Sequence, residues 1–226
     1  MRAPGARTWR EKVDIVIYGS GGHGKVLADA AGCAGDHVVG FLDDNPQLKG
    51  RMVMGHPVLG GAEDLATLRE RGVRVAVAIG NNATRRRVAV RVTEAGLEVA
   101  SIVHPSAVIA RSARLGTGVQ VLAKAVVGPE AQVGDGVIVN TGATVDHDCV
   151  LGAYCQVNPG VHIAGTVTVG EEAFIGTGAS VIPGMRIGAR TTVGAGAVVV
   201  EDLPPDVVAM GVPARVTRQL MKNPGG

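Results

Sequence analysis

Aliphatic residues return at every sixth position between residues 106 and 201, without an insertion or a deletion. The series runs from Ile109 to Val199, and the position two residues before each aliphatic is usually small, as at Ala125 and Cys149. Glycine, asparagine or aspartate often follows the aliphatic residue, and these types tolerate the positive φ of a tight turn. A period of six does not match the 3.6 residues of a helical turn, and the repeat is rich in β-branched residues. The pattern predicts a solenoid of short parallel strands whose aliphatic and small positions face inward.

Residues 13–103 show a second pattern, in which short apolar runs alternate with helix-like segments. The expected strands are residues 13–18, 37–42, 73–79 and 97–103, and the expected helices are residues 24–32, 63–71 and 83–95. Such alternation predicts a parallel sheet with right-handed crossovers, whose ligands lie at the carboxyl ends of the strands. We therefore expect a Rossmann-like α/β domain over residues 1–103, a parallel β-helix over residues 104–202, and a C-terminal tail over residues 203–226.

Three loops should meet at the carboxyl edge of the expected sheet. The first, Gly19–Gly24, has the glycine spacing of a dinucleotide-binding fingerprint between a strand and a helix, the second carries Asp43 and Asp44, and the third is Gly80–Asn82. Glycines let the backbone approach a phosphate, and a carboxylate can accept hydrogen bonds from a ribose or a base. The residues that we expect to bind a nucleotide are Gly21, Gly22, His23, Asp43 and Asp44. A structural α/β cap is the alternative, and an NAD-dependent oxidoreductase is disfavoured because no second mononucleotide-binding half precedes the repeat.

Chemistry within the repeat centres on its histidines, at positions 104, 147 and 162. His162 stands between two inward residues and should be an ordinary outward-facing histidine. His147 falls at a corner between Asp146 and Asp148, where a neighbouring carboxylate can fix the imidazole tautomer and raise its pKa. The hexad pattern resembles that of the hexapeptide-repeat, left-handed β-helices, in which three hexads make one coil and residues about eighteen apart stack. The resemblance implies that Gly165 lies above His147, where it could donate its N–H to a thioester carbonyl. His147 is thus the candidate general base, with an exposed histidine of no function as the alternative.

Other function classes receive little support. None of the three histidine separations is a multiple of about eighteen, so no pair stacks and a zinc hydrolase or hydratase is disfavoured; we expect no metal. The net charge of +2 gives no reason to expect nucleic acid or a membrane surface as a partner. All three cysteines, Cys33, Cys149 and Cys155, are interpreted as core residues rather than a disulfide framework. Because no apolar run has the length of a signal peptide or a membrane span, we expect a cytoplasmic protein.

Several segments together carry a family resemblance: IYGSGGHGK, FLDD, AIGNN, NTGATVDHDC and GVPAR. They resemble the hexapeptide-repeat, left-handed β-helix acyltransferases, and among these the bacterial nucleotide-sugar acetyltransferases of the sialic-acid O-acetyltransferase-like and amino-sugar N-acetyltransferase group. The resemblance implies that the N-terminal domain binds a nucleotide sugar and that acetyl-CoA is the co-substrate. The favoured reaction is transfer of acetyl to the amino group of a UDP-linked 4-amino sugar. O-acetylation of a sialic-acid-type sugar and a non-catalytic nucleotide-sugar-binding protein are the alternatives.

The resemblance also implies roles for individual residues. It makes His147 the general base and Asp148 its supporting carboxylate, and it places the sugar near Asn140. Gln156 stands where many relatives carry a second histidine that binds the acetyl group or the substrate; glutamine can donate a hydrogen bond there but cannot titrate. CoA is expected along Gly165, Pro183 and Arg215.

We also expect a homotrimer, because a prism has three flat faces and the resemblance points the same way. Outward residues should then contact a neighbouring copy, and we name Val137, Ile138, Asn140 and His162 as examples. CoA would lie in the groove between two prisms. The last residues, 223–226, should be disordered.

Overall fold

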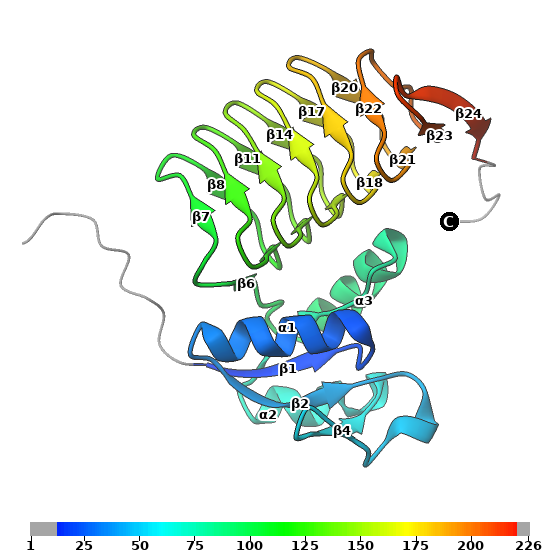
Figure 1. Ribbon diagram of the computed structural model, residues 1–226. Coiled ribbons are helices and arrows are strands. Elements are labelled where there is room, and N and C mark those ends of the chain that lie inside the picture. Colours follow the sequence, from blue (N-terminus) through cyan, green and yellow to red (C-terminus); the bar gives the residue numbers. More distant parts are fainter. Residues whose placement is uncertain (1–12, 221–226) are drawn as a thin grey trace, which may run out of the picture.

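The computed structural model describes residues 13–220, so the expected disorder of residues 223–226 lies outside it. An N-terminal α/β domain lies below one face of a long prism built from repeated coils (Figure 1). Within the described residues, no helix is long and apolar enough to cross a membrane.

The N-terminal domain is a five-stranded sheet between helices. Its elements are β1 (Asp14–Tyr18), α1 (Gly22–Cys33), β2 (His37–Leu42), the 3-10 helix η1 (Pro46–Leu48), β3 (Met52–Val53), β4 (His56–Gly60), the 3-10 helix η2 (Ala62–Asp64), α2 (Leu65–Glu70), β5 (Arg74–Val77) and α3 (Asn82–Glu94). The strand order is β3-β4-β2-β1-β5. Alternate residues of β1 face opposite layers: Ile17 packs with Leu27 of α1, whereas Val16 packs with Val88 of α3. Strand periodicity therefore places helices on both faces of the sheet.

The sheet differs from the prediction in two places. β3 pairs antiparallel with β4, so a hairpin that the apolar pattern missed makes the sheet mixed rather than wholly parallel. The strand expected over residues 97–103 does not join the sheet as a full strand. Val99 makes only an isolated bridge to Val75, and the chain then leaves this sheet as β6 (Ile102–Val103), which pairs with the first coil of the solenoid. The backbone changes partner here because Ile102 N–H bonds to Val119 O, in register with the repeat.

The predicted solenoid is confirmed. Its two-residue strands are β7 (Val108–Ile109), β8 (Arg114–Leu115), β9 (Gln120–Val121), β10 (Val126–Val127), β11 (Gln132–Val133), β12 (Ile138–Val139), β13 (Thr144–Val145), β14 (Val150–Leu151), β15 (Gln156–Val157), β16 (His162–Ile163), β17 (Thr168–Val169), β18 (Phe174–Ile175), β19 (Ser180–Val181), β20 (Arg186–Ile187), β21 (Thr192–Val193) and β22 (Val198–Val199). The second residue of each strand is the predicted aliphatic. Val127, Val145 and Ile163 pair in succession, so each coil takes 18 residues, and three parallel sheets enclose one aliphatic core.

The turns use glycine for a different reason from the one expected. Positive φ falls three residues after the aliphatic, as at Asp148 (φ 56°) and Thr166 (φ 59°), and not on the residue directly after it. At that directly following position, glycine is needed for space. A Cβ on Gly152 would lie 2.5 Å from the backbone nitrogen of Glu171 in the next coil. Close stacking of successive coils, rather than backbone handedness, therefore explains these glycines.

The sheet that starts at β6 continues past the last regular coil. β23 (Val207–Met210) pairs with β21, and β24 (Arg215–Gln219) folds back antiparallel on β23. The prolines at 204 and 205 therefore do not end this sheet. The chain resumes parallel pairing after them and closes the far end of the prism (Figure 1).

Two of the three cysteine interpretations are confirmed. Cys149 and Cys155 are buried inside the prism, but Cys33, the last residue of α1, is exposed. The interpretation of Cys33 as a core residue was wrong because it falls on the solvent side of the last helical turn.

Candidate active site

His147 lies on the edge of the prism where β13 turns into β14. The turns of successive coils stack along this edge in steps of 18 residues, and backbone bonds connect them. Asp148 N–H donates to Pro129 O (3.0 Å) below, and Thr166 N–H donates to His147 O (2.9 Å) above. We call this edge the histidine edge; its stacked positions are Pro129, His147, Gly165, Pro183 and Glu201.

Both aspartates beside His147 contact it. The Asp148 carboxylate lies 2.8 Å from Nδ1 of the ring, and Asp146 accepts the backbone N–H of His147 at 2.8 Å. The hydrogen bond that Asp148 accepts from the ring is the main cause that raises the pKa of His147 above its usual value. When the ring is neutral, Nδ1–H donates to Asp148, which assigns the lone pair to Nε2. A general base at this position would therefore act through Nε2.

Gly165 lies directly over the ring, as the repeat predicted. A Cβ at this position would lie 2.5 Å from both Cε1 and Nε2 of His147, so only glycine leaves the ring in place. In the described part of the chain no acceptor takes the N–H of Gly165, whereas its carbonyl accepts from Thr166 Oγ1 (2.6 Å) and Gly184 N–H (3.0 Å). A free donor thus adjoins the candidate base.

The residues expected to bind CoA share this edge. Pro183 and Glu201 continue the stack above Gly165, and the guanidinium of Arg215 donates to the Glu201 carboxylate at 2.9 Å. The structure therefore brings Gly165, Pro183 and Arg215 onto the edge that carries His147. Their role toward CoA stays a prediction.

Gln156 and Asn140 lie elsewhere. Gln156 is on β15, in the sheet that faces the N-terminal domain, and not beside His147 of the same chain. It is buried, its Nε2 donates to Asn158 Oδ1 at 2.8 Å, and its Oε1 has no partner among the described residues. Asn140, at the turn after β12, accepts the N–H of Thr141 at 2.8 Å. Within one chain, neither residue joins the histidine edge.

The expected nucleotide loops do converge at one edge of the N-terminal sheet, and their two aspartates differ. Asp43 accepts Ser20 N–H at 3.0 Å, Ser20 Oγ at 2.6 Å and Asn45 N–H at 3.1 Å, so its carboxylate braces the glycine loop. Burial raises the pKa of Asp43, but these hydrogen bonds outweigh it and leave the pKa lowered. Asp44 is exposed, and Tyr18 Oη (2.5 Å) and Arg91 (3.3 Å) hold it. Asp44 is therefore the carboxylate that a ligand can reach.

The glycine loop presents open backbone on one side and a histidine contact on the other. A Cβ on Gly21 or Gly22 would meet nothing within 4 Å, so the start of α1 is accessible. His23 instead turns to the β-helix, where its Nε2 lies 2.7 Å from Oε1 of Gln120. Gln120 Nε2 donates to Val77 O at 2.7 Å, which fixes the amide and assigns the proton to His23 Nε2. Burial lowers the pKa of His23, so the ring is neutral.

A groove of about 400 Å³ continues from these loops along the β-helix. One wall is the loop and first turn of α3, and the other is the sheet that carries β18 and β21. Its lining residues are Gly80, Asn81, Asn82, Ala83, Glu172, Phe174, Arg190, Thr192 and Leu220. Sequence reasoning anticipated Gly80–Asn82 but not the opposite wall, because outward positions of a repeat carry no signal of which face is covered.

Comparisons with known proteins agree with this architecture. The family model of the PglD N-terminal domain matches residues 14–92. PerB from Caulobacter crescentus, solved in complex with CoA and GDP-perosamine, is 46% identical with a TM-score of 0.87, and the match covers 90% of this chain and 97% of that chain. The acetyltransferase domain of PglB from Neisseria gonorrhoeae, solved with acetyl coenzyme A, is 39% identical with a TM-score of 0.86 and coverage of 92% and 100%. The chain belongs to the hexapeptide-repeat nucleotide-sugar N-acetyltransferases.

Two further comparisons complete this assignment. WeeI from Acinetobacter baumannii is 27% identical with a TM-score of 0.83, and the match covers 90% of this chain and 99% of that chain. Comparison with the curated proteins finds no match. The membership confirms the left-handed β-helix and the acetyl-CoA-dependent transfer to an amino sugar, and it favours N-acetylation over the O-acetylation and binding-protein alternatives.

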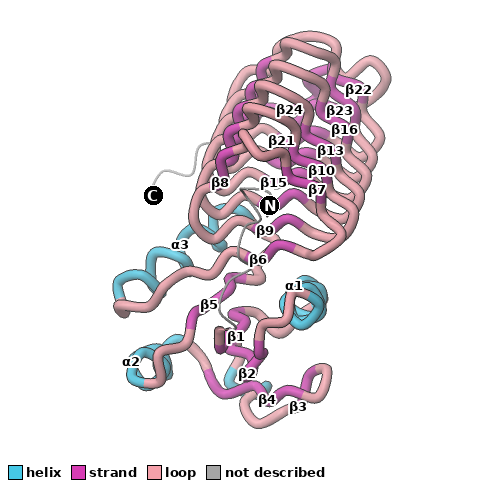
Figure 2. The backbone as a smooth tube through the Cα atoms, turned by 90° about the vertical axis from the view of Figure 1, so that its left-hand side faces the viewer, coloured by secondary structure: helices cyan, strands magenta, loops and turns pink. Residues whose placement is uncertain are grey.

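In this N-acetyltransferase, the two parts of the site lie on opposite sides of the prism. The nucleotide loops and the groove adjoin the sheet that starts at β6 and faces the N-terminal domain. The histidine edge, seen as the row of turns that begins between β7 and β8, runs along the far side (Figures 1 and 2). A sugar bound at those loops would therefore lie on the side of the prism away from His147 of the same chain.

Proposed function

We propose that this enzyme transfers acetyl from acetyl-CoA to the amino group of a nucleotide-linked 4-amino sugar by direct attack, with His147 as general base. The observation that carries the proposal is the contact of His147 with Asp148 on one side and Gly165 on the other. Nε2 takes a proton from the attacking amine while the N–H of Gly165 stabilises the oxyanion on the former thioester carbonyl. Collapse of the tetrahedral intermediate releases the CoA thiolate, which accepts the proton.

No acyl-enzyme is needed in this scheme. Cys149 and Cys155 face the interior of the prism, and burial raises the pKa of both thiols, that of Cys155 to about 12. A neutral, buried thiol is a poor nucleophile. Both substrates are therefore bound together when transfer occurs, which agrees with separate sites for the sugar and for CoA.

The nucleotide sugar belongs, in this proposal, at the edge formed by the open backbone of Gly21 and Gly22, the exposed carboxylate of Asp44, and the groove beyond Gly80. Helix α1 starts at this edge and directs its first N–H groups toward a diphosphate. The sequence interpretation favoured uridine, but PerB holds GDP-perosamine. We therefore propose a guanosine diphosphate sugar as the substrate.

The active assembly is, in this proposal, a homotrimer in which His147 of one copy approaches the sugar bound by the next. The opposite placement of the two half-sites supports this, since a single chain cannot complete the site. The expectation was wrong, however, for two of the residues named as contacts with a neighbouring copy. Val137 and Ile138 are fully buried within one chain, Val137 in the prism core and Ile138 in the sheet facing the N-terminal domain, so they cannot meet a neighbour.

Thiol release from acetyl-CoA tests the function, with GDP-linked and UDP-linked 4-amino sugars and their 4-hydroxy counterparts as acceptors. We expect turnover with the GDP-linked amine and little with the hydroxyl compounds. Turnover with the UDP-linked amine alone would correct the nucleotide but keep the reaction. Turnover with hydroxyl acceptors only, or with none, would contradict the proposed reaction.

A further inference from the structure

Arg85 is a buried cation at the seam between the two domains. It lies in the second turn of α3, only 1% of its surface is exposed, and no carboxylate among residues 13–220 forms an ion pair with it. Burial lowers its pKa to about 10, so the guanidinium stays charged at neutral pH. A buried charge without a counterion needs hydrogen bonds to every donor, because desolvation is costly.

Backbone carbonyls of both domains supply those bonds. On the N-terminal side, Nη1 donates to Ile79 O (3.0 Å) and Gly80 O (3.4 Å), which belong to the loop between β5 and α3. On the β-helix side, Nε donates to Gly136 O (2.9 Å) and Nη2 donates to Tyr154 O (2.7 Å). The guanidinium thus ties one short loop to two turns of the prism.

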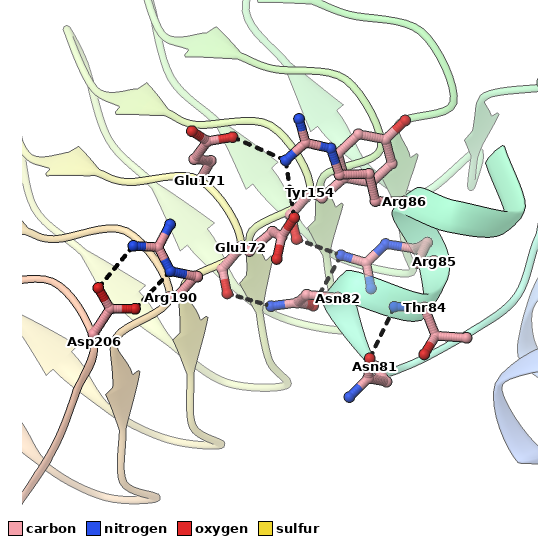
Figure 3. Close-up of polar contacts among 10 residues, drawn as sticks. All are labelled: Asn81, Asn82, Thr84, Arg85, Arg86, Tyr154, Glu171, Glu172, Arg190 and Asp206. Carbon is pink, nitrogen blue, oxygen red and sulfur yellow. Dashed lines mark hydrogen bonds and ion pairs between the residues drawn. The ribbon is translucent and has the colours of Figure 1, made fainter. Parts of the chain in front are cut away.

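Asn82 extends the contact by one more coil. Its Oδ1 accepts from Arg85 Nη2 at 3.0 Å, and its Nδ2 donates to Glu172 O at 2.9 Å (Figure 3). The three β-helix carbonyls, at Gly136, Tyr154 and Glu172, are spaced by 18 residues and therefore belong to successive coils on one corner. Arg85 and Asn82 set the loop in register with the repeat.

The same loop forms one wall of the groove. Gly80, Asn81 and Asn82 face Phe174 and Thr192 across it. The loop supplies one wall and the β-helix the other, so the bonds that fix the loop to the prism also fix the distance between the walls. A lysine could not replace Arg85, because a single ammonium group cannot reach all the carbonyls that are arranged around the planar guanidinium.

We propose that Arg85 is a positioning residue for the nucleotide sugar: it sets the width of the groove between the loop at Gly80 and the β-helix wall at Phe174. This inference rests on the proposed placement of the sugar substrate in that groove. Arg85 itself contacts neither the diphosphate nor the reacting amine. Its effect reaches the substrate through the loop backbone.

The test compares steady-state kinetics of Arg85→Lys and Asn82→Ala with those of the wild type, using the GDP-linked 4-amino sugar. We expect KM for the sugar to rise, by up to about 100-fold for Arg85→Lys, since small misplacements can cost this much. KM for acetyl-CoA should stay unchanged, because the coenzyme is expected along the histidine edge of a neighbouring copy, and the loop at Gly80 is not part of that edge. Asn82→Ala should show the same selectivity with a smaller rise, and it decides the question if Arg85→Lys does not fold.

Arg87→Lys is the matched control, since Arg87 is exposed on the same helix and, among residues 13–220, bonds only to Thr84 Oγ1 of its own turn. It should leave both KM values unchanged. A lower Tm with an unchanged KM for the sugar in Arg85→Lys and Asn82→Ala would show that these contacts between the domains only stabilise the fold. That result would overturn the inference. Failure of the proposed function itself would be distinct, because the wild type would then not acetylate the sugar.

Discussion

At the scale of single residues, the proposed chemistry depends on three neighbours along one edge. Asp148 fixes the orientation of the His147 imidazole and favours its charged form. Gly165 leaves room for the ring and a free N–H beside it. Asp148 lies in the left-handed region at φ 56°. Each of the three can be changed without touching the prism core.

Replacing His147 tests the proton acceptor directly. His147→Ala should lower kcat by about 10²–10⁴, the usual contribution of a positioned general base. The side chain is exposed, so the protein should fold normally. Calorimetric titration should find acetyl-CoA affinity unchanged, because the ring is not expected to hold the coenzyme. Full activity of the variant would eliminate His147 as the base.

The pH profile tests the influence of Asp148. A base acts when unprotonated, and the hydrogen bond that Asp148 accepts from the ring raises the pKa of His147, so kcat/KM should rise through a pKa above the ordinary value of about 6.5. Asp148→Asn removes the main cause of the increase and should move the rising limb to lower pH. It should also lower kcat modestly at high pH, because the ring loses its anchor. An unmoved limb would show that another group titrates.

Gly165→Ala tests the space over the ring. The new methyl would lie 2.5 Å from His147 Nε2, so the ring must turn away from its position. We expect kcat to fall while Tm changes little. Gly32→Ala is the control, since a Cβ there meets nothing within 4 Å. A variant with normal kcat would indicate that the ring position is not critical.

At the scale of elements, the carboxyl ends of β1, β2 and β5 collect the loops that should bind the nucleotide. The carboxylate of Asp43 accepts hydrogen bonds from Ser20, whereas the carboxylate of Asp44 is exposed. The seam made by Arg85 then connects this edge to the β-helix. In the proposed function, binding and chemistry are therefore carried by different elements.

Asp44→Ala tests this division. It should raise KM for the nucleotide sugar and change kcat little, since it removes binding that is equal in the ground and transition states. Asp36→Ala is a suitable control because Asp36 precedes β2, at the opposite edge of the sheet. Loss of kcat at unchanged KM would contradict a binding role for this loop.

At the scale of the whole molecule, the proposed site requires two copies of the chain. The nucleotide loops and the histidine edge lie on opposite sides of one prism, so closed cyclic symmetry is needed to bring them together. The copies need not exchange any element for this. Only their relative placement matters.

Mixed assemblies test the shared site. Light scattering should give a trimer, and a mixture of His147→Ala and Asp44→Ala chains, refolded or co-expressed, should turn over faster at low sugar concentration than either variant alone. Some interfaces in the mixture pair an intact loop with an intact histidine. A monomer in solution, or no gain on mixing, would show that each chain completes its own site.

The sequence by itself determined the β-helix, its inward positions and the stacking of Gly165 on His147, because an unbroken period of six fixes every residue's place in its coil. It also predicted that the loops with glycines and carboxylates meet at one edge of the N-terminal sheet, because the carboxyl ends of parallel strands lie together. It did not determine which face of the prism the N-terminal domain covers, and so it misplaced Ile138 and missed Arg85, Gln120 and the hairpin at β24. Those features depend on contacts between segments far apart in the chain, which follow no period. Only the tertiary structure decided that the two half-sites face away from each other.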